Sequence, residues 1–449
     1  MAKSNSVSPA RLTAFEILRR VADGAYASVL LAAREGELSP VDRALCHELV
    51  MGVLRRQLWL DRLVEHYANR KIAGLDESVR ISLRLGLYQL RFLSRIPPSA
   101  AVNESVNLVH FARLRSASSL VNAVLRRATR EPELDPTSDI KDPLERLSVA
   151  TSHPGWLIER WSEALGVEEA EAFARANNEP APIAFRVVNN RAQEAEVCES
   201  LRAGLAELFP SKISAGAWRI SGAGNLLSEL AAAGKVYVQD EASQLVGSLL
   251  DAQPGQRVLD LCAAPGSKAT HIADLTRNSA VIVAADLHQH RLRTVVSSAQ
   301  LQGLTSIHSV VLDGLKALPL LECVFDRVLV DAPCSGTGTL RRNPEIRWRI
   351  SPADIHDLAR RQKQLLFNAA RAVRTGGRLV YSTCSVEPDE NEAVVQTFLE
   401  NNENFSLVKL DVTANMQAAL GAVRTWPHRE GSDGFFVCAF ERKSAPTSV

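Results

Sequence analysis

From about residue 236 onward, short apolar runs rich in β-branched residues alternate with longer stretches of helical periodicity. The runs are RVLDLC (257–262), AVIVAAD (280–286), IHSVVLD (307–313), DRVLVDAP (326–333) and GRLVYSTC (377–384). This alternation is typical of βαβ units around a mostly parallel, doubly wound sheet. The run GFFVCAF (434–440) is expected to add a last edge strand. Because ligands bind at the carboxyl ends of strands in such sheets, the functional residues are expected there.

The first 130 residues follow a different pattern. Apolar side chains between Leu12 and Val21 recur at helical spacing, which predicts amphipathic helices, and Ser119 is placed to cap the last of them. Residues 131–143, EPELDPTSDIKDP, lack periodicity and are rich in proline and acid, as in a linker. A chain of 449 residues is too long for one compact core. We expect three parts: a helical domain (1–135), a linker with a small α/β subdomain (136–235), and an α/β domain (236–449).

Charge is divided unevenly along the chain. Residues 1–130 contain 20 basic and 11 acidic residues, a net charge of +9, whereas the remainder carries −8. Nearly all of the basic residues in the first part are arginines. An arginine-rich domain suggests contact with a polyanion such as nucleic acid, although a solvated helical surface would show the same excess.

Several classes of protein are disfavoured by composition. No apolar run is long enough to span a membrane, and the start, MAKSNSVSPARL, has no apolar signal core. Seven cysteines in 449 residues do not suggest a disulfide framework. We therefore expect a cytoplasmic protein whose cysteines are either core residues or reactive thiols.

The first candidate site is DLCAAPGSKATH, in which an apolar strand leads through small residues into a helix. Small side chains let a bulky ligand approach the backbone, and the N–H groups of the loop can face its polar end. A tight turn without a ligand is the alternative, but the whole string is unusual for that. The residues expected at the ligand are Cys262, Ala263, Ala264, Pro265, Gly266, Ser267 and Lys268, of which Lys268 could neutralise a carboxylate.

Acidic residues end the next two strands of the expected sheet. Asp286 is placed to accept hydrogen bonds from both ribose hydroxyls of an adenosine, and Asp313 to receive an adenine amino group. A lone Asp after a strand is usually a helix cap. Two at successive strand ends, after the loop above, favour a nucleoside cofactor without a phosphate grip, which fits S-adenosylmethionine better than a dinucleotide.

Two further strands end at a thiol. Cys334 follows Asp331 in DAPCSGTGTLRRNPEIRWR, and Cys384 stands in YSTCSVEPDENE, ahead of Glu387 and Asn391. One cysteine at a strand end is more often a buried apolar residue, but two at neighbouring strand ends beside an aspartate suggest chemistry. Zinc is not expected, because the chain has no Cys-x-x-Cys pair.

A methyl donor and two thiols suit one reaction in particular. Carbon 5 of a pyrimidine becomes nucleophilic only after a thiolate adds to C6, and an acid near N3 must offset the charge that develops. The C5 proton must then leave and the thiol must be expelled. One cysteine can attack while the other assists release, on a base that is unpaired or flipped out.

Taken together, these strings resemble the bacterial 16S ribosomal RNA cytosine-5 methyltransferase B family (RsmB/Sun/Fmu) of the NOL1/NOP2/Sun superfamily. The resemblance rests on QDEAS (239–243), CAAPGSK (262–268) and the two cysteine strings. In addition, AVNESV (101–106) and SSLVNAVLRR (118–127) resemble a NusB-like helical RNA-binding domain. The resemblance implies an all-α NusB-like domain followed by a Rossmann-like S-adenosylmethionine-dependent methyltransferase domain.

The resemblance also implies roles for single residues. Cys384 would be the nucleophile and Cys334 would promote product release, while Asp331 would hold the base near N3 and also touch the cofactor. DNA cytosine-5 methyltransferases attack with the Pro-Cys thiol instead, so this assignment depends on the resemblance. Residues 262–268, with Asp286, Asp313 and Arg291, would grip S-adenosylmethionine; no metal is implied.

A basic stretch follows the Pro-Cys loop and is a candidate for RNA contact. Residues 341–378 carry ten basic and three acidic residues, with Trp348 among the arginines. Basic side chains hold phosphates and an aromatic ring can stack on a base, although a solvated helix is the alternative. The residues expected to bind RNA are Arg341, Arg342, Arg347 and Trp348, with Arg126 and Arg127 in the helical domain.

We therefore expect a monomeric cytoplasmic enzyme that makes 5-methylcytosine in 16S rRNA, free or in a partly assembled small subunit. The alternatives are a tRNA cytosine-5 methyltransferase and a non-catalytic RNA-binding assembly factor.

Overall fold

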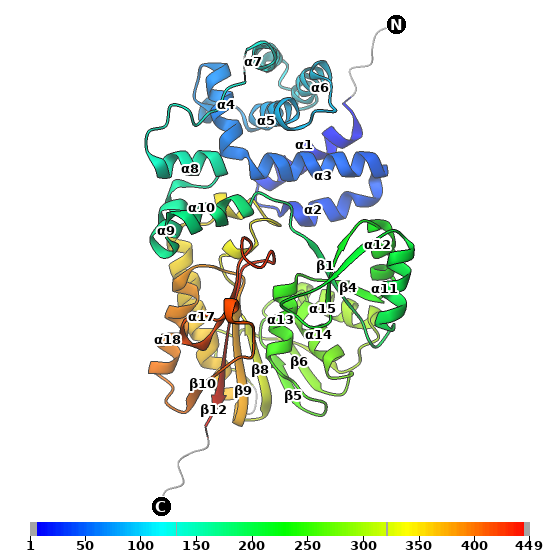
Figure 1. Cartoon of the computed structure of the whole chain (residues 1–449), viewed down its shortest axis with the longest axis vertical. Helices are drawn as coiled ribbons and strands as arrows, with labels where there is room; N and C mark the ends of the chain where they lie inside the picture. The colour runs from blue at the N-terminus through cyan, green and yellow to red at the C-terminus, as the bar shows by residue number, and fades with distance from the viewer. Residues whose placement is uncertain (1–6, 132, 320–321, 444–449) are drawn as a thin grey trace, which may run out of the picture. The chain divides into compact units, whose positions relative to one another are not determined.

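The computed structural model describes residues 7–131, 133–319 and 322–443 (Figure 1). Contacts within the chain divide it into two compact units: Met1–Pro180 with Leu340–Arg349, and Ala181–Thr339 with Ile350–Val449. This two-way division differs from the three predicted ranges, which stay a prediction. Residues up to 180 group with the helical part, and so do ten residues that follow the Cys334 loop in sequence. In the described part of the chain, no helix is both long enough and apolar enough to cross a membrane.

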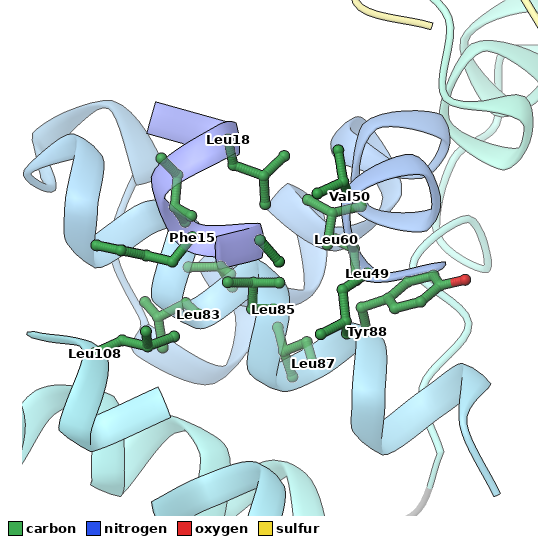
Figure 2. Packing of buried hydrophobic residues seen from close by; sticks show 14 of the residues in the cluster. Phe15, Leu18, Leu49, Val50, Leu60, Leu83, Leu85, Leu87, Tyr88 and Leu108 are labelled. Carbon is green, nitrogen blue, oxygen red and sulfur yellow. The ribbon is translucent and has the colours of Figure 1, made fainter. Parts of the chain in front are cut away.

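The first unit is helical, as the periodicity of its apolar residues predicts. Its core gathers side chains from successive amphipathic helices, among them Phe15, Leu49, Leu60 and Leu83 (Figure 2). The helices are α1 (Pro9–Ala22), α2 (Ala27–Arg34), α3 (Pro40–Arg55), α4 (Gln57–Ala68), α5 (Glu77–Phe92), α6 (Pro98–Phe111), α7 (Ser118–Arg130), α8 (Pro143–Thr151), α9 (Gly155–Leu165), α10 (Val167–Ala176) and the short α16 (Ile346–Arg349).

Side-chain caps set the start of several of these helices. Ser39 accepts a hydrogen bond from the Asp42 N–H at the start of α3, and Asp76 accepts one from the Ser78 N–H at the start of α5. The predicted cap at Ser119 is wrong: α7 begins one residue earlier, at Ser118, and its preceding residue makes no side-chain cap. A 3₁₀ turn that leads directly into α7 takes the place of the cap.

Arg347 is fully buried in the first unit. Its guanidinium donates to the Ser152 carbonyl (3.1 Å) and to the Asn178 side-chain oxygen (2.9 Å). Burial, with a smaller contribution from the nearby Arg55, lowers its pKa to about 9. In the same segment, the buried Glu345 accepts from the Ala27 N–H at the start of α2 (2.8 Å). These bonds account for the grouping of residues 340–349 with the helical unit.

An Arg347→Ala variant is expected to destabilise the protein by about 2–4 kcal/mol, because it opens a cavity and leaves buried acceptors unpaired. Urea denaturation of the purified variant measures the loss. Arg130→Ala, at an exposed arginine of the same unit, is the matched control and should change the free energy of unfolding by less than about 0.5 kcal/mol. Equal stability of the two variants would contradict the anchoring role of Arg347.

The second unit opens with a small antiparallel sheet in the order β2-β3-β1-β4. Its apolar core lies between the strands and two helices and includes Phe185, Leu201 and Leu227. The elements are β1 (Ile183–Val187), α11 (Glu194–Ala203), β2 (Glu207–Pro210), β3 (Ala217–Ser221), α12 (Gly224–Ala232) and β4 (Val236–Val238).

The large sheet of this unit has the order β10-β12-β9-β8-β5-β6-β7, with β11 paired to β12. Strands β9, β8, β5, β6 and β7 pair in parallel, whereas β12 and β10 are antiparallel. The strands are β5 (Arg257–Asp260), β6 (Val281–Asp286), β7 (Ile307–Val311), β8 (Phe325–Asp331), β9 (Val373–Thr383), β10 (Phe405–Val408), β11 (Val423–Thr425) and β12 (Phe435–Arg442). The expectation that residues 434–440 form the edge strand is wrong, because β10 pairs with the far side of β12.

Helices cover both faces of this sheet, which confirms the predicted doubly wound α/β fold. One apolar cluster joins the strands to α17 (Pro352–Ala372) and α18 (Glu392–Glu400), through side chains such as Leu366 and Val395. Another joins them to α13 (Glu241–Leu249), α14 (Ser267–Leu275) and α15 (Gln289–Leu301), through Val246 and Ile272. Crossover helices on both faces leave the carboxyl ends of the parallel strands as the place for a site.

Candidate active site

Two thiols meet at the carboxyl ends of neighbouring strands. Cys334 lies three residues beyond β8 and Cys384 lies one residue beyond β9, and these strands pair in parallel with Asp331 opposite Ser382. The two Sγ atoms are 3.3 Å apart and both residues are partly exposed. The structure thus brings together the two cysteines that the sequence singles out, at a surface that a ligand can reach.

The thiol of Cys334 is held in its protonated form. Its hydrogen bond with Cys384, followed by burial, raises the pKa of Cys334 well above the usual range. Either sulfur can be the donor in this contact, and a Cys334 that keeps its proton donates to Cys384 when Cys384 is a thiolate. A sulfur that accepts a hydrogen bond is stabilised as a thiolate, which is the nucleophilic form of cysteine.

Asp331 lies beside this pair and is held by two partners. Its Oδ2 is 2.7 Å from Nζ of Lys268, and its Oδ1 accepts a hydrogen bond from the Ser382 hydroxyl (2.8 Å). Burial lowers the pKa of Lys268, but the charge and hydrogen bond of Asp331 outweigh it, so the pKa is raised overall. Lys268 therefore neutralises a carboxylate of the chain itself, and it remains a cation next to the thiols.

The small-residue loop forms as the sequence predicts, between β5 and α14. Ala263 and Ala264 are buried, Pro265 is exposed, and Gly266 has φ +107° immediately before α14. A Cβ at Gly266 would lie 3.0 Å from the Cα of Val295, so the close packing of α14 and α15 requires glycine here. Beyond this loop, Arg291 donates to the Ala264 carbonyl (3.0 Å) and thereby fixes its shape.

The two predicted nucleoside-binding acids also lie at or just beyond strand ends. Each accepts a hydrogen bond from the backbone N–H two residues later. Asp286 accepts from the His288 N–H (3.0 Å) and pairs with Arg291 (3.3 Å). Asp313 accepts from the Leu315 N–H (3.0 Å). These bonds form local turns: the N-cap of α15 is His288, without a side-chain cap, and no helix follows Asp313 in the described residues before 320, so the helix-cap alternative is not realised at either position. Each carboxylate still has lone pairs that can accept hydrogen bonds from a ligand, so cofactor binding by Asp286 and Asp313 stays a prediction.

Asp260 was not singled out from the sequence, yet it is the last residue of β5 and is completely buried. Among the residues that the structure describes, none makes a hydrogen bond of normal geometry to either carboxylate oxygen, although the nearby Cys262 N–H acts to lower its pKa. Burial, and then the charge of Asp331, raise its pKa to about 7, although Lys268 opposes this. A carboxylate that ends a strand looks like a cap in the sequence, so burial was the missing signal.

The raised pKa of Asp260 predicts a pH-dependent stability. A carboxyl group with a raised folded-state pKa favours the folded state at low pH, and this contribution is lost as the pH rises toward 7. An Asp260→Asn variant should therefore gain stability relative to the wild type between about pH 4 and 7, by on the order of 2–4 kcal/mol at the plateau. Melting temperatures of both proteins from pH 5 to 8.5 measure the gap. A gap that shrinks as the pH rises would contradict this account.

The predicted RNA-binding residues all belong to the first unit, whereas the two thiols belong to the second. Arg341 and Arg347 are buried, and the guanidinium of Arg347 is bonded to Ser152 and Asn178, so RNA contact by these two residues stays a prediction that would need their surroundings to open. Arg342 and Trp348 are half-buried. RNA contact by these two residues stays a prediction.

The other two predicted RNA-binding residues, Arg126 and Arg127 on α7, differ in exposure. Arg126 is exposed, with its Nε bonded to Asn122 (2.8 Å). Arg127 is half-buried, pairs with Glu131, and donates to the His66 carbonyl at the end of α4 (3.0 Å). Arg127 therefore stabilises a helix end, and Arg126 is the cleaner probe for nucleic-acid binding.

Comparisons with known proteins agree with this architecture. The family model for the 16S rRNA methyltransferase RsmB/F matches residues 247–441, that for the NusB family matches residues 8–130, and a ferredoxin-like domain of RsmF/B-like methyltransferases matches residues 153–226. Fold, thiol site and family match together define an S-adenosylmethionine-dependent methyltransferase, which confirms the predicted cofactor.

Similarity over nearly the whole chain then gives the family. The probable ribosomal RNA small subunit methyltransferase B of Synechocystis sp. is 38% identical over 96% of this chain and 99% of its own, and that of Bacillus subtilis is 36% identical over 93% and 95%. The solved structure of PH0851 has a TM-score of 0.85 at 29% identity, covering 97% of this chain and 99% of that one. The chain belongs to the ribosomal RNA small subunit methyltransferase B family, as its motifs predict.

Proposed function

We propose that this protein methylates carbon 5 of a cytosine in 16S rRNA, through a covalent bond between Cys384 and C6 of the base. The observation that carries the proposal is the 3.3 Å separation of the Cys334 and Cys384 sulfurs beside Asp331. A methyltransferase that acts on a ring nitrogen or a hydroxyl needs no thiol, whereas C5 methylation needs one to add and benefits from a second group that assists elimination. The ribosomal substrate is supported by the names of the relatives.

The residues at the strand ends have distinct parts in this scheme. The Cys384 sulfur, 3.3 Å from that of Cys334, adds to C6 as a thiolate. Asp331, paired with Lys268 at 2.7 Å and bonded to Ser382 two residues before Cys384, would hold the N3 edge of the base. For this contact Asp331 or its partner must donate a proton, and Lys268 is a nearby donor. Cys334 then gives its own proton to solvent, and its thiolate takes the C5 proton as the C5–C6 double bond re-forms and Cys384 leaves as a thiolate.

The cofactor loop fits S-adenosylmethionine in its chemistry. Its alanine and glycine residues keep the side chains of the loop small, and within the described residues the buried carboxylate of Asp260 at the end of β5 makes no hydrogen bond of normal geometry. Residues 262–268 with Asp286, Asp313 and Arg291 would hold the cofactor, which supplies the methyl group as an electrophile. The acids at this end of the sheet suit the positive charge of such a molecule.

Methylation assays with labelled cofactor test the proposal directly. Protein-free 16S rRNA, isolated small subunits and bulk tRNA are supplied separately, and bisulfite sequencing then locates any 5-methylcytosine. We expect label in rRNA, in free or partly assembled form, at a cytosine in an unpaired segment. Label in tRNA alone would reassign the substrate, and binding of RNA without label transfer would make the protein an assembly factor. Activity in a cytoplasmic extract tests the expected location. Gel filtration of the purified protein tests the expected monomeric state.

An Arg126→Glu variant should weaken RNA binding by about 5- to 30-fold at moderate salt, because one phosphate contact is replaced by repulsion. Filter binding at several salt concentrations measures this, and the salt dependence should become shallower. Cofactor affinity should not change, since α7 belongs to the other unit. Glu131→Arg is the opposite change near the end of the same helix; it should not weaken binding. Unaltered RNA affinity in the Arg126 variant would show that the helical unit serves another purpose.

A further inference from the structure

We propose that Glu390 is a positioning residue that sets the separation of the two thiols, by binding the residue that follows each of them. This inference deepens the proposed function and rests on it. Ser335 comes directly after Cys334, and Ser385 comes directly after Cys384. The one carboxylate of Glu390 receives hydrogen bonds from both serines.

The contacts of Glu390 use both carboxylate oxygens. Oε1 accepts from the Ser335 backbone N–H (2.9 Å) and from Nε2 of Gln362 (2.9 Å). Oε2 accepts from the Ser385 hydroxyl (2.5 Å) and from the Ser335 hydroxyl. Four donors on two oxygens match the capacity of an ionised carboxylate. The neutral isostere glutamine has only one acceptor oxygen and would turn N–H groups toward two of these donors.

The carboxylate is itself held in place from several sides. Gln362 on α17 bonds both to Glu390 and to the Pro333 carbonyl (2.9 Å), one residue before Cys334. The Tyr381 hydroxyl donates to the backbone carbonyl of Glu390 (2.5 Å). Because these partners come from β9, α17 and the Cys334 loop, the position of Glu390 is fixed by the sheet and a long helix. Such support is what a precise distance between two loops requires.

Because Glu390 is buried, the loss of its hydrogen bonds would cost more free energy than at an exposed position. Glu390 has no exposed surface, and burial raises its pKa, although the bonds from Ser335, Ser385 and Gln362 oppose the rise. A buried charge is tolerated only when its hydrogen bonds are satisfied, so the two cysteine loops and the carboxylate hold each other in one arrangement. The side chain contacts the residues that follow the thiols and acts through the loops, which makes it a positioning residue and not a catalytic one.

The test compares Glu390→Gln with Glu392→Gln, the same change two residues along, where the carboxylate binds Arg424 (2.7 Å) and neither serine. Single-turnover methylation and cofactor binding are measured separately. Glu390→Gln should slow methyl transfer by about 10- to 100-fold, as expected for misplaced reacting groups, with cofactor affinity within about twofold of the wild type. The control should stay close to the wild type in both.

A second readout needs no methylation and reports the thiol separation itself. Diamide takes two electrons and two protons from a pair of thiols, which become a disulfide, while diamide becomes the hydrazine. Mass spectrometry of the folded protein follows the Cys334–Cys384 disulfide. Its rate of formation should fall by about tenfold or more in Glu390→Gln, because exchange depends on the access of one sulfur to the other, and should be unchanged in Glu392→Gln.

The outcomes separate this inference from the proposed function. Slower disulfide formation in Glu390→Gln supports the inference even if no RNA is methylated by the wild type, in which case only the proposed function fails. If both disulfide formation and methyl transfer are unchanged in Glu390→Gln, the positioning role of Glu390 is overturned. If Glu390→Gln does not fold, the double variant Ser335→Ala and Ser385→Ala removes the hydroxyl donors and should show the same slowing. A double variant with wild-type disulfide formation would also overturn the inference.

Discussion

A Cys384→Ala variant is expected to lose methyl transfer to RNA by at least about 10³-fold, while it still binds S-adenosylmethionine. Without a thiolate at C6, carbon 5 of the base is too electron-poor to attack the methyl group, and removing a covalent nucleophile costs far more than removing a binding contact. The cofactor loop between β5 and α14 does not depend on this side chain. Single-turnover transfer of label and equilibrium dialysis with the cofactor measure the two effects separately.

The control for this prediction is Cys323→Ala. Cys323 is an exposed thiol of the same unit, so its loss reports any general effect of a cysteine-to-alanine change. It should leave transfer within about twofold of the wild type. Retention of a tenth or more of the activity in Cys384→Ala would rule out the proposed covalent step at that residue.

A Cys334→Ala variant is expected to accumulate a covalent complex with RNA instead of failing to form one. In the proposed scheme Cys384 can still add and the methyl group can still be transferred, but the group that assists release is gone. Cys334 is suited to accept the C5 proton once it is a thiolate, because the hydrogen bond with Cys384 and burial raise its pKa and so make its thiolate a stronger base. Denaturing gels with labelled RNA should show a slowly migrating band that contains both partners, and turnover should fall by about 10²-fold or more.

The double variant Cys334→Ala and Cys384→Ala is the matched control and should show no such band. If Cys384→Ala accumulates the covalent complex and Cys334→Ala does not, the parts of the two thiols are exchanged. The order of attack would then follow that of DNA cytosine-5 methyltransferases.

The catalytic end of the sheet could be predicted from the sequence because its signals are local. A strand, a loop of small residues and a helix occupy consecutive positions around Pro265, and the thiols stand directly after strands β8 and β9. Parallel pairing then brings the strand ends together whatever the rest of the chain does. The proximity of Cys334 and Cys384 follows from two strand assignments and one pairing.

What could not be predicted depends on contacts between distant segments. Arg347 stands in a basic stretch and looks like an RNA ligand, yet its donors are used by Ser152 and Asn178, more than 160 residues earlier. Glu390 lies in an acidic string that could equally be a solvated turn, and only the fold brings it to Ser335, 55 residues away. In both cases a charged side chain is satisfied by buried partners, and burial is a property of tertiary structure.

The order of the C-terminal strands was missed for a related reason. An apolar run such as Phe435–Arg442 shows that a strand is buried, and this one is buried because β9 and β10 flank it on either side. β10 is short and only partly buried, so its own sequence signal is weak. Sequence alone does not order antiparallel strands at the end of a sheet.

The most direct test of this account is to supply rRNA fragments containing 5-fluorocytidine, together with S-adenosylmethionine, to the wild-type protein. Fluorine cannot leave C5 as a proton does, so the adduct should persist after methyl transfer. Proteolysis and mass spectrometry then identify the residue attached to the base. The account predicts a stable complex joined through Cys384; a complex joined through Cys334, or no covalent complex with any ribosomal fragment, would contradict it.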